Sequence, residues 1–94
     1  MLIKSLFFLL FFSFLGSALY AHTFKVLIFS KTEGFRHSSI PNGIAAIQQL
    51  GLDNDFEVDA TEDATMFTLE NLLQYDAVIF LSTTGDVLNA EQQT

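Results

Sequence analysis

The chain has 94 residues, carries a formal net charge of −7 at pH 7 and contains no cysteine. The acidic balance argues against a nucleic acid as partner, because there is no basic patch to release counterions from phosphates. The absence of cysteine excludes a disulfide and a thiol nucleophile within these 94 residues.

The first 21 residues are typical of a secretory signal peptide. Lys4 supplies a positive charge, Ser5–Leu15 is almost entirely Phe and Leu, and small residues follow up to Ala21. The apolar run is shorter than the roughly 20 residues that span a bilayer, which favours a cleaved leader over the alternative of an uncleaved membrane anchor. We expect an apolar leader helix, cleavage after Ala21 or, as second choice, Ala18, and a secreted or periplasmic protein that meets the membrane only during export.

After the leader, a strand and a helix are predicted in sequence. The apolar run at residues 24–30 is rich in β-branched and aromatic residues, which is typical of a buried parallel strand. Isoleucines then recur at helical spacing and predict a helix over residues 40–50. Ser38 or Ser39 is expected to cap this helix, and Gly51 to stop it. Pro41 is tolerated in its first turn.

A second half with the same alternation follows. Residues 56–60 alternate apolar and acidic side chains and predict a strand near a sheet edge. Thr68 is expected to cap a short helix, and the fully apolar residues 77–81 predict a central strand. Asn89, with Gln92 three residues later, resembles a capping box for a further helix.

Strands that alternate with helices predict an α/β fold with a doubly wound parallel sheet. If the strand order begins 2-1-3, the order reverses between the first and third strands. We interpret residues 22–94 as the N-terminal part of a longer domain, because the last predicted helix has only just begun at Thr94.

The candidate site follows from this topology. Ligands of doubly wound sheets bind beyond the carboxyl ends of the strands, where the strand order reverses. This places Lys31–Ser39 beside Ser82–Asp86 on one rim. Arg36 could hold a carboxylate or orient sugar hydroxyls, and His37 could act as an acid or base near neutral pH. The spacing alone favours a plainer alternative, in which Arg36 pairs with Glu33 or an acid on the flank and His37 caps the helix.

Weaker signals surround this pair. Glu62 and Asp63 form either a carboxylate pair or, as is more usual, a solvated turn. No glycine-rich phosphate loop is present, so no nucleotide cofactor is indicated and the cofactor stays unknown. His22 and His37 are too isolated to define a metal site.

Several segments together carry a family resemblance. Lys25–Ile40 reads KVLIFSKTEGFRHSSI, and Thr61–Asp63, Leu72–Phe80 and Ser82–Leu88 fit the same pattern in the same order. The chain resembles the ThuA-like (trehalose utilisation) family, most specifically at residues 34–37. The resemblance implies a flavodoxin-like fold similar to class I glutamine amidotransferases, and a role in the utilisation of trehalose or related keto-sugars. Members often carry a Gly-Ile-His segment after the next strand, beyond Thr94, and the amidotransferase cysteine is absent here.

The expected partner is therefore a small-molecule carbohydrate, with further domains of the same chain as additional partners. Arg36 and His37 are the candidates for catalysis. The candidates for substrate binding lie in the rim loops and their flank: Lys31, Gly34, Phe35, Ser39, Glu62, Asp63, Thr83 and Gly85. Two functions stay open, a sugar-active enzyme and a non-catalytic carbohydrate-binding or scaffolding module of a larger secreted protein.

Overall fold

The computed structural model describes residues 22–94. The predicted leader, with its helix and both cleavage positions, lies outside the described residues. Among the residues that are described, no helix has the length and apolar character needed to cross a membrane.

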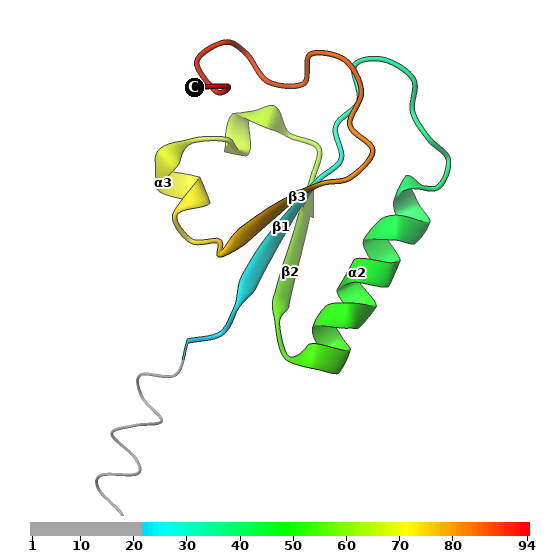
Figure 1. Ribbon diagram of the computed structural model, residues 1–94, viewed down its shortest axis with the longest axis vertical. Helices are drawn as coiled ribbons and strands as arrows, with labels where there is room; N and C mark the ends of the chain where they lie inside the picture. The colour runs from blue at the N-terminus through cyan, green and yellow to red at the C-terminus, as the bar shows by residue number, and fades with distance from the viewer. Residues whose placement is uncertain (1–21) are drawn as a thin grey trace, which may run out of the picture.

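The described chain forms a three-stranded parallel sheet (Figure 1). The strands are β1 (Lys25–Phe29), β2 (Glu57–Thr61) and β3 (Ala77–Phe80), within one residue of the predicted bounds at each end. Their order is β2-β1-β3, so the 2-1-3 condition on which the candidate site depends is met. Within residues 22–94 the central strand is β1 and β3 lies at the edge, so a central third strand stays a prediction for the longer domain.

Burial follows this strand order. Residues 26–29 of β1 are buried, because β1 has a neighbour on each side and helices above and below. The rings of Phe29, Phe67 and Phe80 pack together, with centroids 4.6–5.7 Å apart. Phe80, on the outer strand, stays 50% exposed. The core of the described residues is therefore centred on β1.

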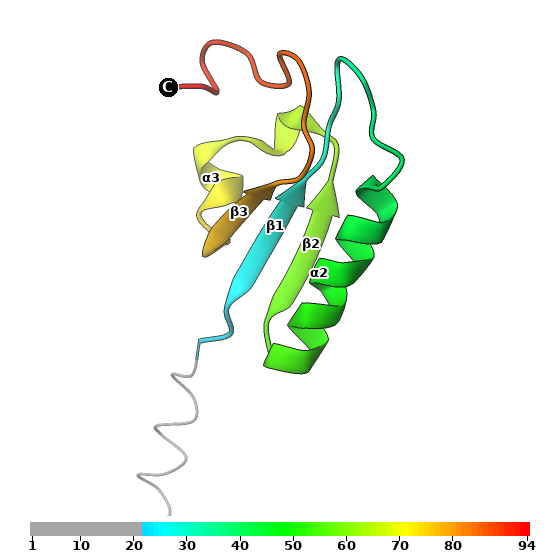
Figure 2. The ribbon, with the colours of Figure 1, turned by 45° about the vertical axis from the view of Figure 1, so that its right-hand side comes forward.

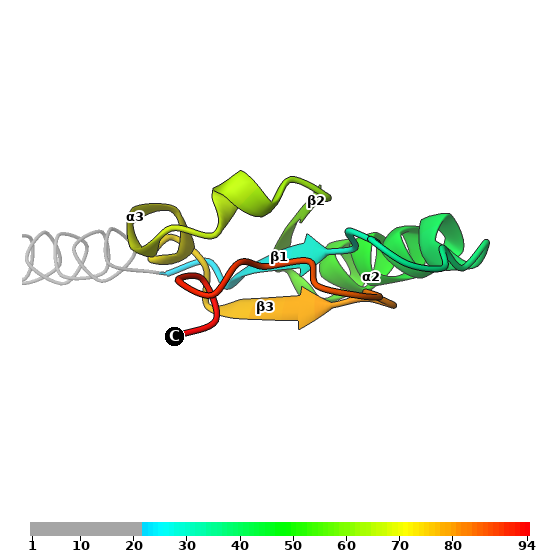
Figure 3. The same ribbon diagram turned by 90° about the horizontal axis from the view of Figure 1, so that it is seen from above.

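The connecting helices lie on opposite faces of the sheet (Figures 1 and 2). Helix α2 (Ile40–Asn54) joins β1 to β2, while the 3-10 turn η1 (Ala64–Met66) and the short helix α3 (Leu69–Leu72) join β2 to β3. Right-handed crossovers explain the arrangement, because the chain moves one way along the sheet through α2 and the other way through α3. The view from above in Figure 3 separates the two layers.

Helix α2 runs four residues beyond its predicted end. Gly51 lies inside the helix and is buried, so its prediction as a stop was wrong. The helix ends instead at Asp55, which adopts a left-handed conformation with φ 58°, and whose amide donates to the Gly51 carbonyl. A Cβ at Gly51 would lie 2.7 Å from the Phe56 carbonyl oxygen. Glycine is needed here for the close approach of β2 and not for a turn.

The helix caps agree with the sequence only in part. The Thr68 side chain accepts a hydrogen bond from the Asn71 amide at 3.1 Å, as predicted for the start of α3. Ser39 occupies the N-cap position of α2 but makes no side-chain cap. Asn89 and Gln92 do exchange the two capping-box hydrogen bonds, both 2.9 Å long. Residues 90–93 form turns, and the helix predicted after Asn89 stays a prediction, because only five residues follow Asn89.

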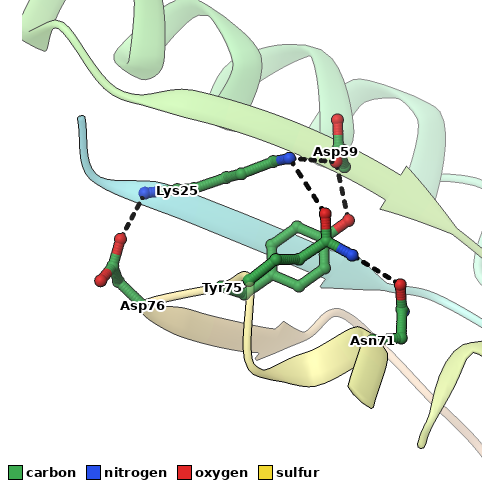
Figure 4. A network of polar contacts seen from close by, with 6 residues as sticks. Lys25, Asp59, Asn71, Tyr75 and Asp76 are labelled. Atoms are coloured by element: carbon green, nitrogen blue, oxygen red, sulfur yellow. Dashed lines mark hydrogen bonds and ion pairs between the residues drawn. The ribbon is translucent and has the colours of Figure 1, made fainter. Parts of the chain in front are cut away.

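A polar network ties the strands together at the end of the sheet opposite the rim loops (Figure 4). The Lys25 ammonium contacts Asp59 at 3.6 Å, and Asp59 accepts a hydrogen bond from the Tyr75 hydroxyl at 2.7 Å. Burial and the bond to Asp59 raise the pKa of Tyr75 to about 12. Asp76 accepts from the Lys25 amide at 2.8 Å and pairs with His22. These contacts connect β1, β2 and the segment before β3, and the rim loops lie at the opposite end of the sheet.

Candidate functional site

The loops that leave β1 and β3 are hydrogen-bonded to each other at the carboxyl edge of the sheet. Thr32 and Thr84 form an isolated parallel bridge, and the Glu33 amide donates to the Thr84 carbonyl at 2.9 Å. The Thr84 hydroxyl donates to the Phe35 carbonyl at 2.7 Å. Residues 31–39 and 82–86 therefore share one rim, the geometry expected from the strand order.

Two glycines allow this close contact between the loops. Gly85 has a φ of 73°, and a Cβ there would lie 3.1 Å from Glu33 Cβ and 3.3 Å from the Gly34 nitrogen. A Cβ on Gly34 would lie 3.4 Å from Thr84 Oγ1. Both glycines were candidates for substrate binding, and the structure gives them a backbone role in joining the loops.

Arg36 bridges the first rim loop to the loop after β2. Its Nη1 donates to the Ser30 carbonyl at 3.3 Å and also pairs with the Glu62 carboxylate. The predicted alternative of a flank acid is thus present as Glu62, while Glu33 pairs with Lys31 at 3.0 Å. Both contacts of Arg36 use one terminal nitrogen, and its side chain is 43% exposed. The remaining guanidinium donors face no described partner and suit a ligand at the rim.

His37 and Phe35 stand together on the outer part of the same loop. Their rings meet edge to face with centroids 5.0 Å apart, and Phe35 is 71% exposed. The His37 carbonyl accepts from the Ile40 amide at 3.3 Å, so its backbone closes the turn that starts α2. The His37 residue itself is exposed, so both the acid–base role and the capping role of its side chain stay predictions.

The largest cavity at the rim is lined by Lys31. It has a volume of about 640 Å³ and is bounded by η1 and by the segment after β3. Thr65, Asp86, Asn89 and Gln92 supply polar groups. Neither Arg36 nor His37 lines it. Of these predicted site residues, Lys31 therefore lines the cavity, whereas Arg36 and His37 lie outside it.

Glu62 and Asp63 do not act as a carboxylate pair. Glu62 pairs with Arg36, whereas Asp63 accepts from the Thr65 hydroxyl at 2.7 Å and from its amide at 2.9 Å. These bonds cap η1 and hold the pKa of Asp63 below its usual range. Asp63 is a local cap, in line with the turn that the sequence favoured.

The other two candidates lie at the borders of the rim. Ser39 is exposed at the start of α2, where its carbonyl accepts from the Gly43 amide at 2.9 Å. Thr83 is half-buried between Ser82 and Thr84. Ser82 itself has a φ of 51°, unusual for a residue with a side chain, so the backbone turns sharply as β3 ends.

Ser30 is a residue of the rim that the sequence did not single out. It follows β1, is 1% exposed, and its Oγ has no hydrogen-bond partner among the described residues. It lines a smaller cavity of about 160 Å³ with Ile44, Ala60, Thr61 and Glu62. The sequence signal that could have indicated Ser30 is a single hydroxyl residue at the end of an otherwise apolar strand.

The chemistry that these residues offer is hydrogen bonding and acid–base exchange. Lys31 and Arg36 donate, Glu62 and Asp86 accept, and the exposed imidazole of His37 can do either. Within residues 22–94, no group of three or more His, Asp or Glu side chains gathers in a way that could hold a metal ion.

Comparison with known proteins assigns the family. A family model described as "ThuA: Trehalose utilisation" matches residues 25–94, from the start of β1 to Thr94. No curated protein and no solved structure matches the chain. The match covers well over half of the 94 residues, including both rim loops. The chain belongs to the ThuA (trehalose utilisation) family.

Proposed function

We propose that the chain is the N-terminal part of a secreted or periplasmic ThuA-family domain that takes trehalose or a related keto-sugar. The substrate crevice is placed at the carboxyl ends of β1 and β3. The observation that carries the proposal is the cavity of about 640 Å³ beside the joined rim loops, with polar side chains along its wall. The strand order β2-β1-β3 also supports a flavodoxin-like fold, in which this edge is the usual ligand crevice.

A sugar fits the chemistry of this rim. Each sugar hydroxyl both donates and accepts a hydrogen bond, so a wall that mixes donors and acceptors can satisfy it. Lys31, Asp86 and the amides of Asn89 and Gln92 provide such a mixture. The exposed ring of Phe35 offers an apolar face to the C–H groups of a pyranose.

Arg36 and His37 are assigned the chemical roles. The Arg36 side chain keeps free donors beyond its contacts with Ser30 and Glu62, and can orient oxygen atoms of a substrate. His37, exposed on the same loop, can transfer a proton at neutral pH. Neither residue lines the larger cavity, so a substrate bound there must extend out of it to contact them.

A non-catalytic carbohydrate-binding module is the second candidate function. The observation that favours it is the structural engagement of the catalytic candidates, since Arg36 holds Glu62 and the His37 backbone closes a turn. Turnover separates the two functions. An enzyme converts the sugar that it binds, whereas a module releases it unchanged.

The test uses the full-length protein with trehalose as probe. Isothermal titration and product analysis are applied to wild type, Arg36→Ala and His37→Ala, with the thermal midpoint measured for each. We expect weaker binding or lost turnover with little change in the midpoint, because rim loops bury little apolar area. Arg36→Lys should restore charge without the forked geometry, and therefore only part of the binding.

His22→Ala is the matched control, since His22 pairs with Asp76 at the opposite end of the sheet. Sugar binding that is equal in wild type and both rim variants would assign Arg36 and His37 a purely structural role. No binding of trehalose or related keto-sugars by wild type would remove the proposed function.

A further inference from the structure

Ser30 is the buried polar residue of the described core, and only its hydroxyl lacks a partner. Its amide donates to the Thr61 carbonyl at 3.1 Å, and its carbonyl accepts from Arg36 at 3.3 Å. Folded proteins nearly always satisfy buried hydroxyls, because a hydroxyl that loses its hydrogen bonds to water on burial and gains none in return destabilises the fold. An unpartnered Oγ at the carboxyl end of a central strand points to a bound group.

The cavity beside Ser30 can hold such a group. Its volume is about 160 Å³, whereas one water occupies about 30 Å³ in the liquid. Ile44 and Ala60 form an apolar part of the wall, and Thr61 and Glu62 a polar part. The Glu62 side chain is 55% exposed, so the cavity wall reaches the surface at the rim.

The charges beside this cavity favour a neutral ligand. The Glu62 carboxylate and the Arg36 guanidinium form an ion pair, so their charges largely cancel and attract neither an anion nor a cation strongly. A hydroxyl both donates and accepts, so it can donate to Glu62 while it pairs with Ser30 Oγ. The apolar wall suits the carbon that carries the hydroxyl.

We propose that Ser30 Oγ and Glu62 form a subsite for one hydroxyl-bearing arm of the carbohydrate, between the ends of β1 and β2 and helix α2. Arg36 positions the Glu62 carboxylate. The inference rests on the proposed function, and it adds a second pocket on the sheet face opposite the Lys31 cavity.

The test compares Ser30→Ala with wild type in the full-length protein. Trehalose and glucose serve as probes, and glycerol as a minimal hydroxyl compound. Binding is followed by NMR titration, which reports affinity per folded molecule, and stability by the thermal midpoint without sugar. Thr23→Ala is the control, because it removes an exposed hydroxyl before β1, at the other end of the sheet.

We expect Ser30→Ala to weaken sugar binding about threefold to tenfold, the effect of one lost hydrogen bond. Its midpoint without sugar should be equal to or above that of wild type, because an unpaired buried hydroxyl has been removed. Thr23→Ala should bind as wild type does.

Equal affinity of Ser30→Ala and wild type would overturn the subsite and leave the proposed function intact. A lower midpoint with unchanged affinity would also overturn it, and would assign the hydroxyl to a structural water. No binding of any probe by wild type would refute both proposals together.

Discussion

Two glycines of helix α2 provide a sharp test of how the helix packs against the sheet. A Cβ at Gly51 would lie 2.7 Å from the Phe56 carbonyl oxygen and 2.9 Å from Val58 Cγ2. The first of these atoms belongs to the backbone and cannot move without shifting the start of β2. A Cβ at Gly43 would lie 3.1 Å from Leu81 Cδ2, the far end of a flexible side chain. The same substitution should therefore have different effects at the two positions.

The magnitudes follow from two opposing terms. Alanine gains about 1 kcal/mol over glycine in a helix interior. Overpacking costs about 1–3 kcal/mol, with the upper half expected where backbone must shift. Gly51→Ala should thus lower the free energy of unfolding by about 1–2 kcal/mol. Gly43→Ala should leave it unchanged or raise it by up to about 1 kcal/mol, because Leu81 can give way by a few tenths of an ångström.

Urea unfolding of the full-length protein, followed by far-ultraviolet circular dichroism, measures both values. The two variants should share the wild-type slope, so that the midpoints alone report the difference. A midpoint of Gly51→Ala at or above wild type would refute the close approach of α2 and β2. An equal loss in Gly43→Ala would refute the distinction between backbone and side-chain contacts.

Three further predictions concern the rim and the network. Gly85→Ala should lower the free energy of unfolding by about 1–3 kcal/mol, since Gly85 has a positive φ, and chemical denaturation measures the loss. A double-mutant cycle on Arg36 and Glu62 should give a coupling of only about 0.2–1 kcal/mol that declines with added salt, because both side chains are partly exposed. The Lys25 amide, then His22, holds the pKa of Asp76 below its usual range, so its stabilisation should be full above about pH 4 and disappear as pH falls through that lowered pKa. Asp76→Asn should flatten this acid limb in thermal unfolding from pH 7 to pH 2, and an unchanged limb would contradict the role of Asp76.

The strands and their parallel direction could be read from the sequence because they depend on local patterns, whereas the strand order entered only as a condition. The apolar run of β1 and the half-polar pattern of β2 reflect how far each strand is buried. Burial determines where apolar residues recur along the sequence, so both strands can be recognised from it. The alternation of strands with helices then limits the topology to parallel pairing with right-handed crossovers. The placement of both rim loops at one edge follows from that topology alone.

Gly51 shows where a local pattern misleads. A glycine near a helix end is most often a C-terminal stop, and only the close approach of Phe56, just before β2, reveals the other use. The deciding contact lies outside the motif. The capping box at Asn89, by contrast, forms both of its predicted hydrogen bonds.

The pairing of side chains at the candidate site also depends on contacts that a local sequence pattern does not contain. The sequence predicted that Arg36 would pair with an acidic residue, but it left open whether this was Glu33 or an acid on the flank. In the structure Arg36 pairs with Glu62, and Glu33 pairs with Lys31. Ser30 could not be singled out, since a serine after a strand is common. Ser30 stands out only in the folded structure, where its buried hydroxyl has no hydrogen-bond partner among the described residues and lines a cavity.

The division of the rim has a simple cause in the geometry of β1. Consecutive residues of an extended chain place their side chains on opposite faces. Ser30 therefore lines the cavity next to helix α2, while Lys31 lines the larger cavity next to η1. The joined loops and the Arg36–Glu62 pair lie at the edge that the two faces share. A ligand held at this edge can reach both faces only around the strand end, and the proposed sugar, with hydroxyls on more than one side, would contact both faces in this way.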